Sequence, residues 1–551
     1  MKTTNKSSGN PKKDQEEKFY SKFIEKRTPK PSKKAKSAAK KDAPHSEKQF
    51  NSKQKTYHNG AQFNSEKNTT KRFTPKKISP DAAILSCNPS FNTKSIPKDA
   101  REILNDFDKI IQENRPLNSK QIQQLPENIR ELSHQLTDKR ADRRLGYMNE
   151  NTKLSAYVRY FTWWNLVRLT RLFANLPSQA FPQNDCVCID LGSGPLTVIT
   201  ALWLARPELR TKKLTWYCLD ISQNSMTLGE DLYYSVAART IAKSNANDEE
   251  TLSEANAREN QKTTEACWKI IRVKGSFGTQ IKEKADFITC ANMFNELDQA
   301  GDMPPEFQTK KYFDQLMIYS SKNARFILIE PGVPKAARTI SLLRDRFIKA
   351  GKQILAPCPH AFECPMNGFK AYTGSSNKWC NFAFSTEDAP NRLQKLSDNA
   401  KLPKERATLS YVCAVPEEEI ATQNEDDATS PRSDAQNGTD AAQNTSKAAT
   451  LKNKDATLIR VVSDSFRLPG GRTGVYACSK FGLTLLSMQE NGVEMANAAG
   501  QNSVATSKNT TDANKNSTLN LNSGDLLEVK IKTPVDSLCT DEKTGAKVIA
   551  I

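Results

Sequence analysis

The segment "CIDLGSGPLTVIT" (188–200) decides the fold of this chain. It begins as the end of an apolar strand, and the acid Asp190 stands near that end. Gly192 and Gly194 follow in a tight turn, and the apolar run 196–206 is typical of a helix. Glycines in such a turn let a ligand approach the backbone at the positive end of the helix. The pattern predicts an α/β domain with a nucleotide-like ligand at this turn.

Strand-like and helix-like segments alternate from residue 185 to 415, which predicts a parallel sheet with helices on both faces. Asp220 ends the second strand, where its carboxylate can accept hydrogen bonds from ribose hydroxyls. The seven expected strands are "DCVCIDL" (185–191), "LTWYCLD" (214–220), "WKIIRV" (268–273), "ADFITCA" (285–291), "RFILIEPG" (325–332), "KWCNFAF" (378–384) and "TLSYVCAV" (408–415).

Two segments before this domain are expected to be helical, residues 98–140 and the amphipathic stretch 153–176. In the second, the arginines either face phosphates or form the solvated face of a helix whose aromatic side chains pack in the core. These arginines are Arg159, Arg168 and Arg171.

Positive charge is concentrated at the amino-terminal end. The 551 residues carry a formal net charge of +19, and residues 1–80 hold 22 Lys/Arg against 7 Asp/Glu. This tail has few aliphatic residues and is expected to be disordered. It is either a solubility tail or a polycationic arm that binds RNA or DNA phosphates through counterion release.

The chain is expected to be cytoplasmic and bacterial, since it has no apolar run long enough to span a membrane and no secretory signal. A mitochondrial location is less expected, because the tail is rich in Lys rather than Arg. The expected organisation is a disordered basic tail (1–95), a helical region (96–180), the α/β domain (181–415) with a Cys-rich loop (356–380), a disordered insertion (416–456) and a small β-rich region (457–551) with a low-complexity insertion at 490–522. A further insertion is expected at 243–264.

Three cysteines gather in the loop that begins "APCPHAFECPMNGF" (356–369). Cys358 and Cys364 are each followed by proline, and Cys380 comes soon after. Prolines stiffen a loop and withhold amide donors, so the thiols are presented rather than packed. The spacing is not the C-x₂-C of a zinc ribbon and favours an iron–sulfur cluster over zinc, with Cys478 as the candidate fourth ligand. His360 is a further possible ligand, whereas Cys413 is expected in the core.

Several motifs together resemble one family: "DLGSGP" (190–195), "IEPG" (329–332), "APCPH…ECP…WCNF", "LPKERATLSYV" (402–412) and a late Cys-x-x-x-Gly. They resemble the methyltransferase-like family of small-ribosomal-subunit assembly proteins, which has mitochondrial members and bacterial relatives. The resemblance covers roughly residues 100–415 and 457–487. It implies a class I, Rossmann-like methyltransferase fold with a seven-stranded sheet, S-adenosylmethionine as cofactor and a 4Fe-4S cluster. The cofactor-binding residues it implies are Asp190, Gly192, Ser193, Gly194, Asp220 and Asn292, and the cluster ligands are Cys358, Cys364, Cys380 and Cys478.

The resemblance also implies association with the small ribosomal subunit and its rRNA, by a chain expected to be monomeric off the ribosome. One departure is Leu196, which stands where the glycine turn usually has a third glycine and is expected to crowd the cofactor. Another is "ANMFNEL" (291–297), which lacks the Asn/Asp-Pro-Pro-aromatic pattern of amino-group methylation. Asn292, Asn295 and Glu296 either contact the ligand or cap the next helix, so no catalytic residue is assigned.

Three hypotheses follow. The first is an assembly factor that binds small-subunit rRNA and carries a cofactor-binding methyltransferase fold and a cluster. The second is an active rRNA methyltransferase. The third is a zinc-stabilised RNA-binding protein without a cofactor.

Overall fold

The computed structural model describes residues 80–137, 146–247, 267–297, 303–368, 378–417, 456–489 and 520–551. They belong to one unit that runs from Lys77 to Ile551 and contains two β-sheets. The expected tail up to residue 79, most of the expected insertions at 243–264 and 416–456, and residues 490–519 of the insertion at 490–522 lie outside the described residues. Every described helix falls short of the length or the hydropathy that a membrane-spanning segment needs.

The larger sheet has the strand order β4-β3-β2-β5-β6-β9-β7, with β8 paired to β9. Neighbours from β4 to β6 are parallel, whereas β9 runs antiparallel to both β6 and β7. The strands are β2 (Cys186–Leu191), β3 (Leu214–Asp220), β4 (Lys269–Lys274), β5 (Ala285–Ala291), β6 (Ser320–Glu330), β7 (Lys352–Ala356), β8 (Phe382–Ser385) and β9 (Arg406–Pro416). Counted along the chain, the last long strand lies between the fifth and the sixth, which is the class I methyltransferase arrangement that the resemblance implied.

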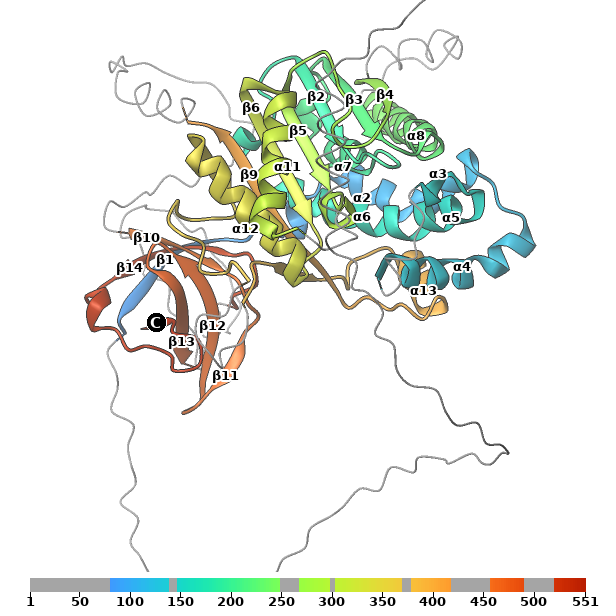
Figure 1. Ribbon diagram of the computed structural model, residues 1–551. Coiled ribbons are helices and arrows are strands. Elements are labelled where there is room, and N and C mark those ends of the chain that lie inside the picture. The colour runs from blue at the N-terminus through green and yellow to red at the C-terminus, as the bar shows by residue number, and fades with distance from the viewer. Residues whose placement is uncertain are drawn as a thin grey trace, which may run out of the picture. The chain divides into compact units, whose positions relative to one another are not determined.

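Two hydrophobic cores lie on the opposite faces of this sheet, because successive strand residues point to opposite sides. Cys188 and Cys218 belong to one core, and their neighbours Ile189 and Leu219 belong to the other. Helices cover both faces, with α11 and α12 on one side and α7 and α8 on the other (Figure 1). These helices are α7 (Thr197–Ala205), α8 (Gln223–Asn247), α11 (Pro305–Tyr319) and α12 (Pro334–Lys349).

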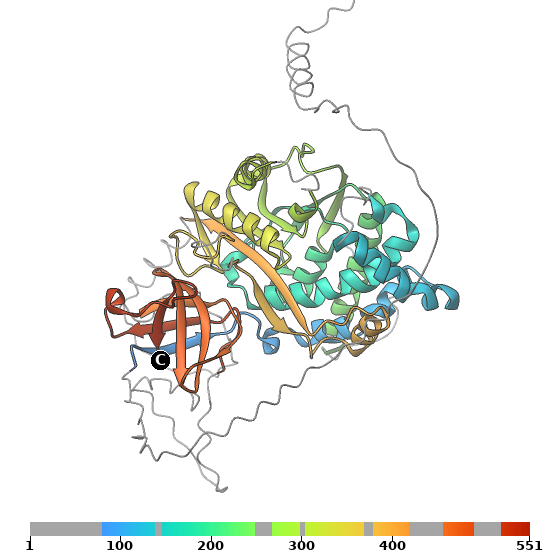
Figure 2. The same ribbon diagram turned by 60° about the horizontal axis from the view of Figure 1, so that its bottom comes forward.

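The expectation of an all-parallel sheet is wrong in its last strands. The long strand β9, drawn in orange in Figure 2, is antiparallel to its neighbours. The expected sixth strand, "KWCNFAF" (378–384), supplies only the short β8, which pairs with β9 off the main path. The sixth strand of the fold is β7, which sequence reasoning missed because only one of its five residues is buried.

The amino-terminal helices cover the side of the sheet where α7 and α8 lie. Residues 151–175 form one continuous helical stretch whose middle, Tyr157–Thr162, is a π-helical turn. The expected helical segments are therefore present, divided into shorter pieces. These are α2 (Lys98–Asn105), α3 (Phe107–Asn114), α4 (Ser119–Thr137), α5 (Asn151–Ala156) and α6 (Trp163–Asn175).

Two of the arginines in this stretch are buried. Arg159 donates to Gln112 Oε1 at 2.9 Å, and Arg171 donates to the carbonyl of Ser385 at 2.9 Å and pairs with Asp388. Their guanidinium groups are thus committed to internal partners. The hypothesis that Arg159 and Arg171 face phosphates is wrong.

The second sheet has the order β1-β14-β10-β12-β13-β15, with β11 paired to β12. Its first strand comes from near the amino terminus and runs antiparallel to β14, with Ala82 opposite Ile531. The strands are β1 (Ala82–Asn88), β10 (Ala456–Val461), β11 (Phe466–Leu468), β12 (Arg472–Ser479), β13 (Gly482–Gln489), β14 (Leu526–Ile531) and β15 (Lys547–Ala550).

The expected boundary of the basic tail at residue 95 therefore lies too far along the chain. Ala82 and Ile84 are almost completely buried in the core of the second sheet. Because the partner of β1 is β14, far away in the sequence, no local pattern predicts the pairing.

Candidate functional site

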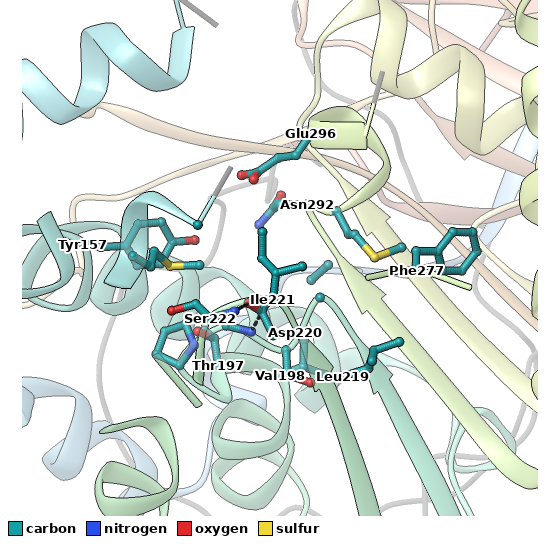
Figure 3. A pocket seen from close by; sticks show the side chains of 18 of the residues that line it. Tyr157, Thr197, Val198, Leu219, Asp220, Ile221, Ser222, Phe277, Asn292 and Glu296 are labelled. Carbon is teal, nitrogen blue, oxygen red and sulfur yellow. Dashed lines mark hydrogen bonds between the residues drawn. The ribbon is translucent and has the colours of Figure 1, made fainter. Parts of the chain in front are cut away.

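A pocket opens at the carboxyl ends of β2, β3 and β5, beside the glycine turn (Figure 3). Here the strand order changes direction, since β3 and β4 continue on one side of β2 and β5 and β6 on the other. Open α/β sheets bind their ligands at such a switch point. About 1110 Å³ of space, open solvent at the mouth included, lies between its walls. The lining includes Tyr147, Tyr157, Gly192, Ser193, Gly194, Asp220, Ile221, Phe277, Asn292 and Glu296.

Both glycines of the turn are required by the backbone. Gly192 and Gly194 have φ of 68° and 49°, in the left-handed region that L side chains rarely adopt. A Cβ on Gly192 would also lie 2.8 Å from the Cβ of Met293. Ser193, between the glycines, donates its hydroxyl to the backbone carbonyl of Asp190 at 2.7 Å. The turn therefore brings bare backbone to the pocket wall.

Leu196 does not crowd the pocket. Its φ of 51° is left-handed, which explains why a glycine suits this position. However, its side chain is fully buried in the hydrophobic core and does not line the pocket. The expected obstruction by Leu196 is therefore wrong.

The two predicted acids have different surroundings. Asp220 lines the pocket, and its two carboxylate oxygens accept the backbone N–H groups of Gly194 at 2.9 Å and Ser222 at 2.8 Å. Asp190 lies behind the turn, where Oδ1 accepts the hydroxyl of Thr289 at 2.7 Å and Oδ2 has no partner. Burial raises the pKa of Asp190 to about 7, although the Thr289 hydrogen bond acts in the opposite direction. Asp220 thus holds the turn and faces the ligand space, whereas Asp190 supports the turn from below.

Asn292 reaches the pocket from the end of β5 with an unusual backbone conformation. Its φ is 61°, and its Oδ1 accepts a hydrogen bond from Nη2 of Arg168 at 3.1 Å. An arginine has only donors, so the atom that faces Arg168 must be the amide oxygen. The amide nitrogen of Asn292 is therefore the group left for a ligand.

The short helix α10 (Phe294–Leu297) is capped by a residue that sequence reasoning missed. Glu330, at the end of β6, accepts the backbone N–H groups of Phe294 at 2.9 Å and Asn295 at 3.1 Å. It is fully buried, and burial raises its pKa to about 8. Asn292 and Glu296 line the pocket while Asn295 does not.

The four cysteines predicted as ligands come from two parts of the chain. Cys358 and Cys364 follow β7, Cys380 lies just before β8, and Cys478 is in β12 of the second sheet. Cys380 was expected within the strand 378–384 but lies outside it, because β8 starts at Phe382. The loop follows the sixth strand of the fold rather than the fifth.

The structure brings these four thiols together. Every pair among them is close enough to interact electrostatically. Burial raises the pKa of Cys358 to about 11, and burial with the neighbouring thiols raises the pKa of Cys380 and Cys478 well above the usual value. A bound metal would lower the pKa of these thiols, since metal binding favours the deprotonated thiolate. Cys413 lies in β9 and is fully buried in the core.

The spacing of the thiols bears on which metal centre fits. Among the described residues, no three His, Cys, Asp or Glu side chains are arranged to hold a single metal ion. A four-iron cluster holds its thiolates farther apart, because each sulfur binds a different iron. An all-thiol donor set also suits soft metals and iron–sulfur clusters. His360 adds a possible nitrogen donor, since its Nε2 lies 3.1 Å from the sulfur of Cys478.

Several solved structures that resemble this chain are methyltransferases. A ribosomal protein L11 methylase from Lactobacillus delbrueckii subsp. bulgaricus shares 15% identity, over 34% of this chain and 69% of the other, with a TM-score of 0.20. A methyltransferase from Geobacter sulfurreducens in complex with S-adenosyl-L-homocysteine shares 9% over 46% and 90% of the two chains, with a TM-score of 0.24. Magnesium protoporphyrin IX methyltransferase from Synechocystis PCC 6803, with bound SAH, shares 11% over 57% and 99%, with a TM-score of 0.23.

No curated protein matches the chain. A family model does match, over residues 181–432, and that family is described as mitochondrial small ribosomal subunit Rsm22. The matched segment contains the glycine turn, the pocket strands and three of the four gathered cysteines. Through residues 181–432, the chain is similar to the family described as mitochondrial small ribosomal subunit Rsm22.

Proposed function

We propose that this protein is an assembly factor of the small ribosomal subunit that binds the rRNA of that subunit. The observation that carries the proposal is the Rsm22 match over the segment that holds both the pocket turn and the cysteine loop. The net charge of +19 supports a nucleic-acid partner, because cationic side chains gain affinity by releasing counterions from phosphates.

The pocket is proposed to hold S-adenosylmethionine, which supplies an activated methyl group when bound. Gly192 and Gly194 expose backbone to the ligand at the start of α7, and Ser193 stiffens the turn between them. Asp220 is proposed to accept the ribose hydroxyls, since a carboxylate has more lone pairs than its two backbone hydrogen bonds use. Asp190 acts indirectly, by supporting the turn.

The acceptor side of the pocket favours binding over methylation of an amino group. Such a methylation uses an Asn/Asp-Pro-Pro-aromatic segment, which "ANMFNEL" (291–297) lacks, and Arg168 already takes one of the two lone pairs of Asn292 Oδ1. Asn292 instead offers its amide N–H₂ to the ligand. We therefore assign no catalytic residue. The alternative function is that of an active rRNA methyltransferase.

Cys358, Cys364, Cys380 and Cys478 are proposed to bind a 4Fe-4S cluster. Three of them belong to the loop after β7 and one to β12, so the cluster would join the loop to the second sheet. The mutual proximity of the four thiols, of which Cys364 and Cys478 belong to buried residues, supports this role. Zinc in place of iron is the rival outcome.

Metal analysis of anaerobically purified protein tests the cluster. We expect brown protein with about four irons per chain, and loss of colour when any of the four cysteines is replaced by serine. Cys413→Ser is the matched control and should keep its iron. One zinc per chain without iron would contradict the cluster.

Calorimetry with S-adenosylhomocysteine tests the pocket. We expect micromolar binding, about −8 kcal/mol, weakened at least tenfold in Asp220→Ala. Absence of binding by the wild-type protein would exclude the cofactor.

Co-sedimentation with purified small subunits tests the partner, and we expect binding to small but not to large subunits. Transfer of tritium from labelled S-adenosylmethionine to rRNA, lost in Asp190→Ala, would identify an active methyltransferase instead.

A further inference from the structure

Two arginines lie buried beside the four thiols, and no sequence motif pointed to either. Arg344 is on α12, and Arg460 is on β10 of the second sheet. Their side chains belong to residues only 2% and 7% exposed. A buried guanidinium is costly unless it is hydrogen-bonded and has a counter-charge nearby. Both arginines donate hydrogen bonds to the loop that contains Cys358.

Arg344 holds the cysteine loop from the side of the larger sheet. Its Nε donates to the sulfur of Cys358 at 3.2 Å. Its Nη2 donates to the backbone carbonyls of His360 at 2.8 Å and Phe362 at 2.7 Å. One side chain thus fixes both a thiol and the backbone on either side of Ala361.

Arg460 holds the same loop from the second sheet. Its Nε donates to the carbonyl of Pro357, the residue before Cys358, at 2.7 Å. Its Nη1 donates to the hydroxyl of Ser90 at 2.7 Å and to the carbonyl of Gly524 at 2.8 Å. The loop that begins at Pro357 is therefore held by Arg344 from helix α12 and by Arg460 from strand β10 of the second sheet.

The charge of the two arginines complements a negative centre. Arg344 forms an ion pair with Asp345, whose side chain is 34% exposed and therefore partly screened by solvent. Arg460 hydrogen-bonds to neutral oxygens and interacts electrostatically with Asp525. Both arginines also attract the thiolate forms of Cys358 and Cys478. Ligation of four thiolates to a cluster would concentrate negative charge where these guanidinium groups lie.

We propose that Arg344 and Arg460 are positioning residues of the thiolate-bound cluster: they hold the Cys358 loop from both sides and balance the negative charge of the ligands. This inference rests on the cluster of the proposed function. Positive charge and N–H···S hydrogen bonds favour the more negative, reduced state of a cluster. Both arginines therefore raise the reduction potential and slow the loss of metal.

The test uses full-length, anaerobically purified protein with single substitutions. Arg344→Gln and Arg460→Gln remove the charge and keep a hydrogen-bond donor, whereas Arg344→Lys and Arg460→Lys keep the charge. Arg346→Gln is the matched control on α12, because Arg346 donates to the backbone of Glu306, away from the thiols. The readouts are iron per chain, the rate of colour loss with a chelator, and the midpoint for uptake of one electron from dithionite through mediator dyes.

We expect the Gln variants to bind the metal about 10–100-fold more weakly, as substitutions next to metal ligands do. Their midpoints should shift to more negative potentials, and the Lys variants should lie nearer the wild-type midpoint. Arg346→Gln should match the wild type. A purely structural role would loosen the loop without this dependence on charge.

Each other result has a defined meaning. Wild-type retention and midpoint in both Gln variants would overturn the inference, as would a shift to more positive potentials or an equal effect in Arg346→Gln. If a Gln variant does not fold, the Lys variant at the same position serves as the test. Wild-type iron content and midpoint in the Lys variant would support the role of the positive charge. Complete loss of iron from the Lys variant would contradict that role. Wild-type protein without iron defeats the proposed cluster itself, and this inference with it.

Discussion

At the scale of single residues, Leu196 shows how a fold accepts a side chain where a glycine is usual. Its backbone is left-handed, at a cost of about 1–2 kcal/mol for an L residue. Its side chain is completely buried in the core, and that burial offsets the cost. The pocket is left open because the side chain points away from it.

At position 196, glycine should give a more stable protein than alanine, which is the reverse of the usual order. Both variants lose a buried leucine, at about 2–5 kcal/mol. Only alanine keeps the left-handed strain, so Leu196→Gly should be more stable than Leu196→Ala by about 1 kcal/mol. Urea unfolding measures the difference, and equal affinities for S-adenosylhomocysteine would verify that the pocket is unchanged. A less stable glycine variant would mean that the turn carries no strain.

Asp190 predicts a pH dependence of stability. Its folded pKa of about 7 exceeds the ordinary value of 3.8, so the folded state binds the proton more tightly than the unfolded state. The resulting stabilisation is complete below the unfolded pKa and is lost as the pH rises through about 7. Asparagine cannot titrate and can still accept the Thr289 hydroxyl.

Between about pH 5 and pH 8, the wild-type protein should therefore lose more free energy of unfolding than Asp190→Asn. Other groups, such as Glu330, titrate in both proteins and cancel in the comparison. Parallel pH curves from denaturant unfolding would show that Asp190 is ionised throughout.

At the scale of elements, the features that could be predicted from the sequence are those that depend on a local pattern of residues. The apolar strands β2, β3, β5 and β6 and the glycine turn were predicted, since buried strands and glycine turns depend on neighbouring residues. The strand β7 was missed because it is mostly half-exposed, and β1 because its partner is distant in sequence.

The candidate site divides in the same way. Gly192, Gly194, Asp220 and Asn292 lie together at the pocket, at the ends of strands β2, β3 and β5. The buried partners Glu330, Arg344 and Arg460 were not predicted, because they reach their contacts from other elements. Arg168 was considered as a phosphate contact or a solvated residue and not as a partner of Asn292. A charged residue outside a recognised motif is expected at the surface, and only the fold shows that it is buried.

The pairing of β1 with β14 predicts the effect of shortening the chain. A chain that starts at residue 78 keeps β1, whereas one that starts at residue 96 loses it and exposes the edge of β14. An uncovered edge strand is prone to aggregation. We expect the shorter chain to unfold at least several degrees lower in a thermal scan, since Ala82 and Ile84 are buried in that core. Equal midpoints would show that β1 adds nothing to the stability of the sheet.

At the scale of the whole molecule, the basic tail offers a test of RNA binding. Residues 1–77 hold all 22 Lys/Arg of the first 80 residues, against 7 Asp/Glu. Each phosphate neutralised adds about 0.7–0.9 to the log–log dependence of affinity on salt. The chain that starts at residue 78 should therefore show a slope smaller by several units while it still prefers small-subunit rRNA to an unrelated RNA of equal length.

Filter binding at several salt concentrations, with full-length protein alongside, makes the comparison. Equal slopes would mean that the tail is only a solubility tail. Loss of the preference would place recognition, and not only charge, in the first 77 residues.

The pairing of β1 with β14 also affects when the second sheet can form during translation. Ala82 leaves the ribosome that makes this protein well before Ile531, its partner. At about 5–20 residues per second, β1 waits on the order of 20–90 s for β14. The loop thiols likewise wait for Cys478 on β12. A product of interrupted translation therefore lacks the closing strands, and one that stops before residue 478 lacks the fourth thiol as well. Only a chain that has been translated past Ile531 can pair β1 with the whole of β14.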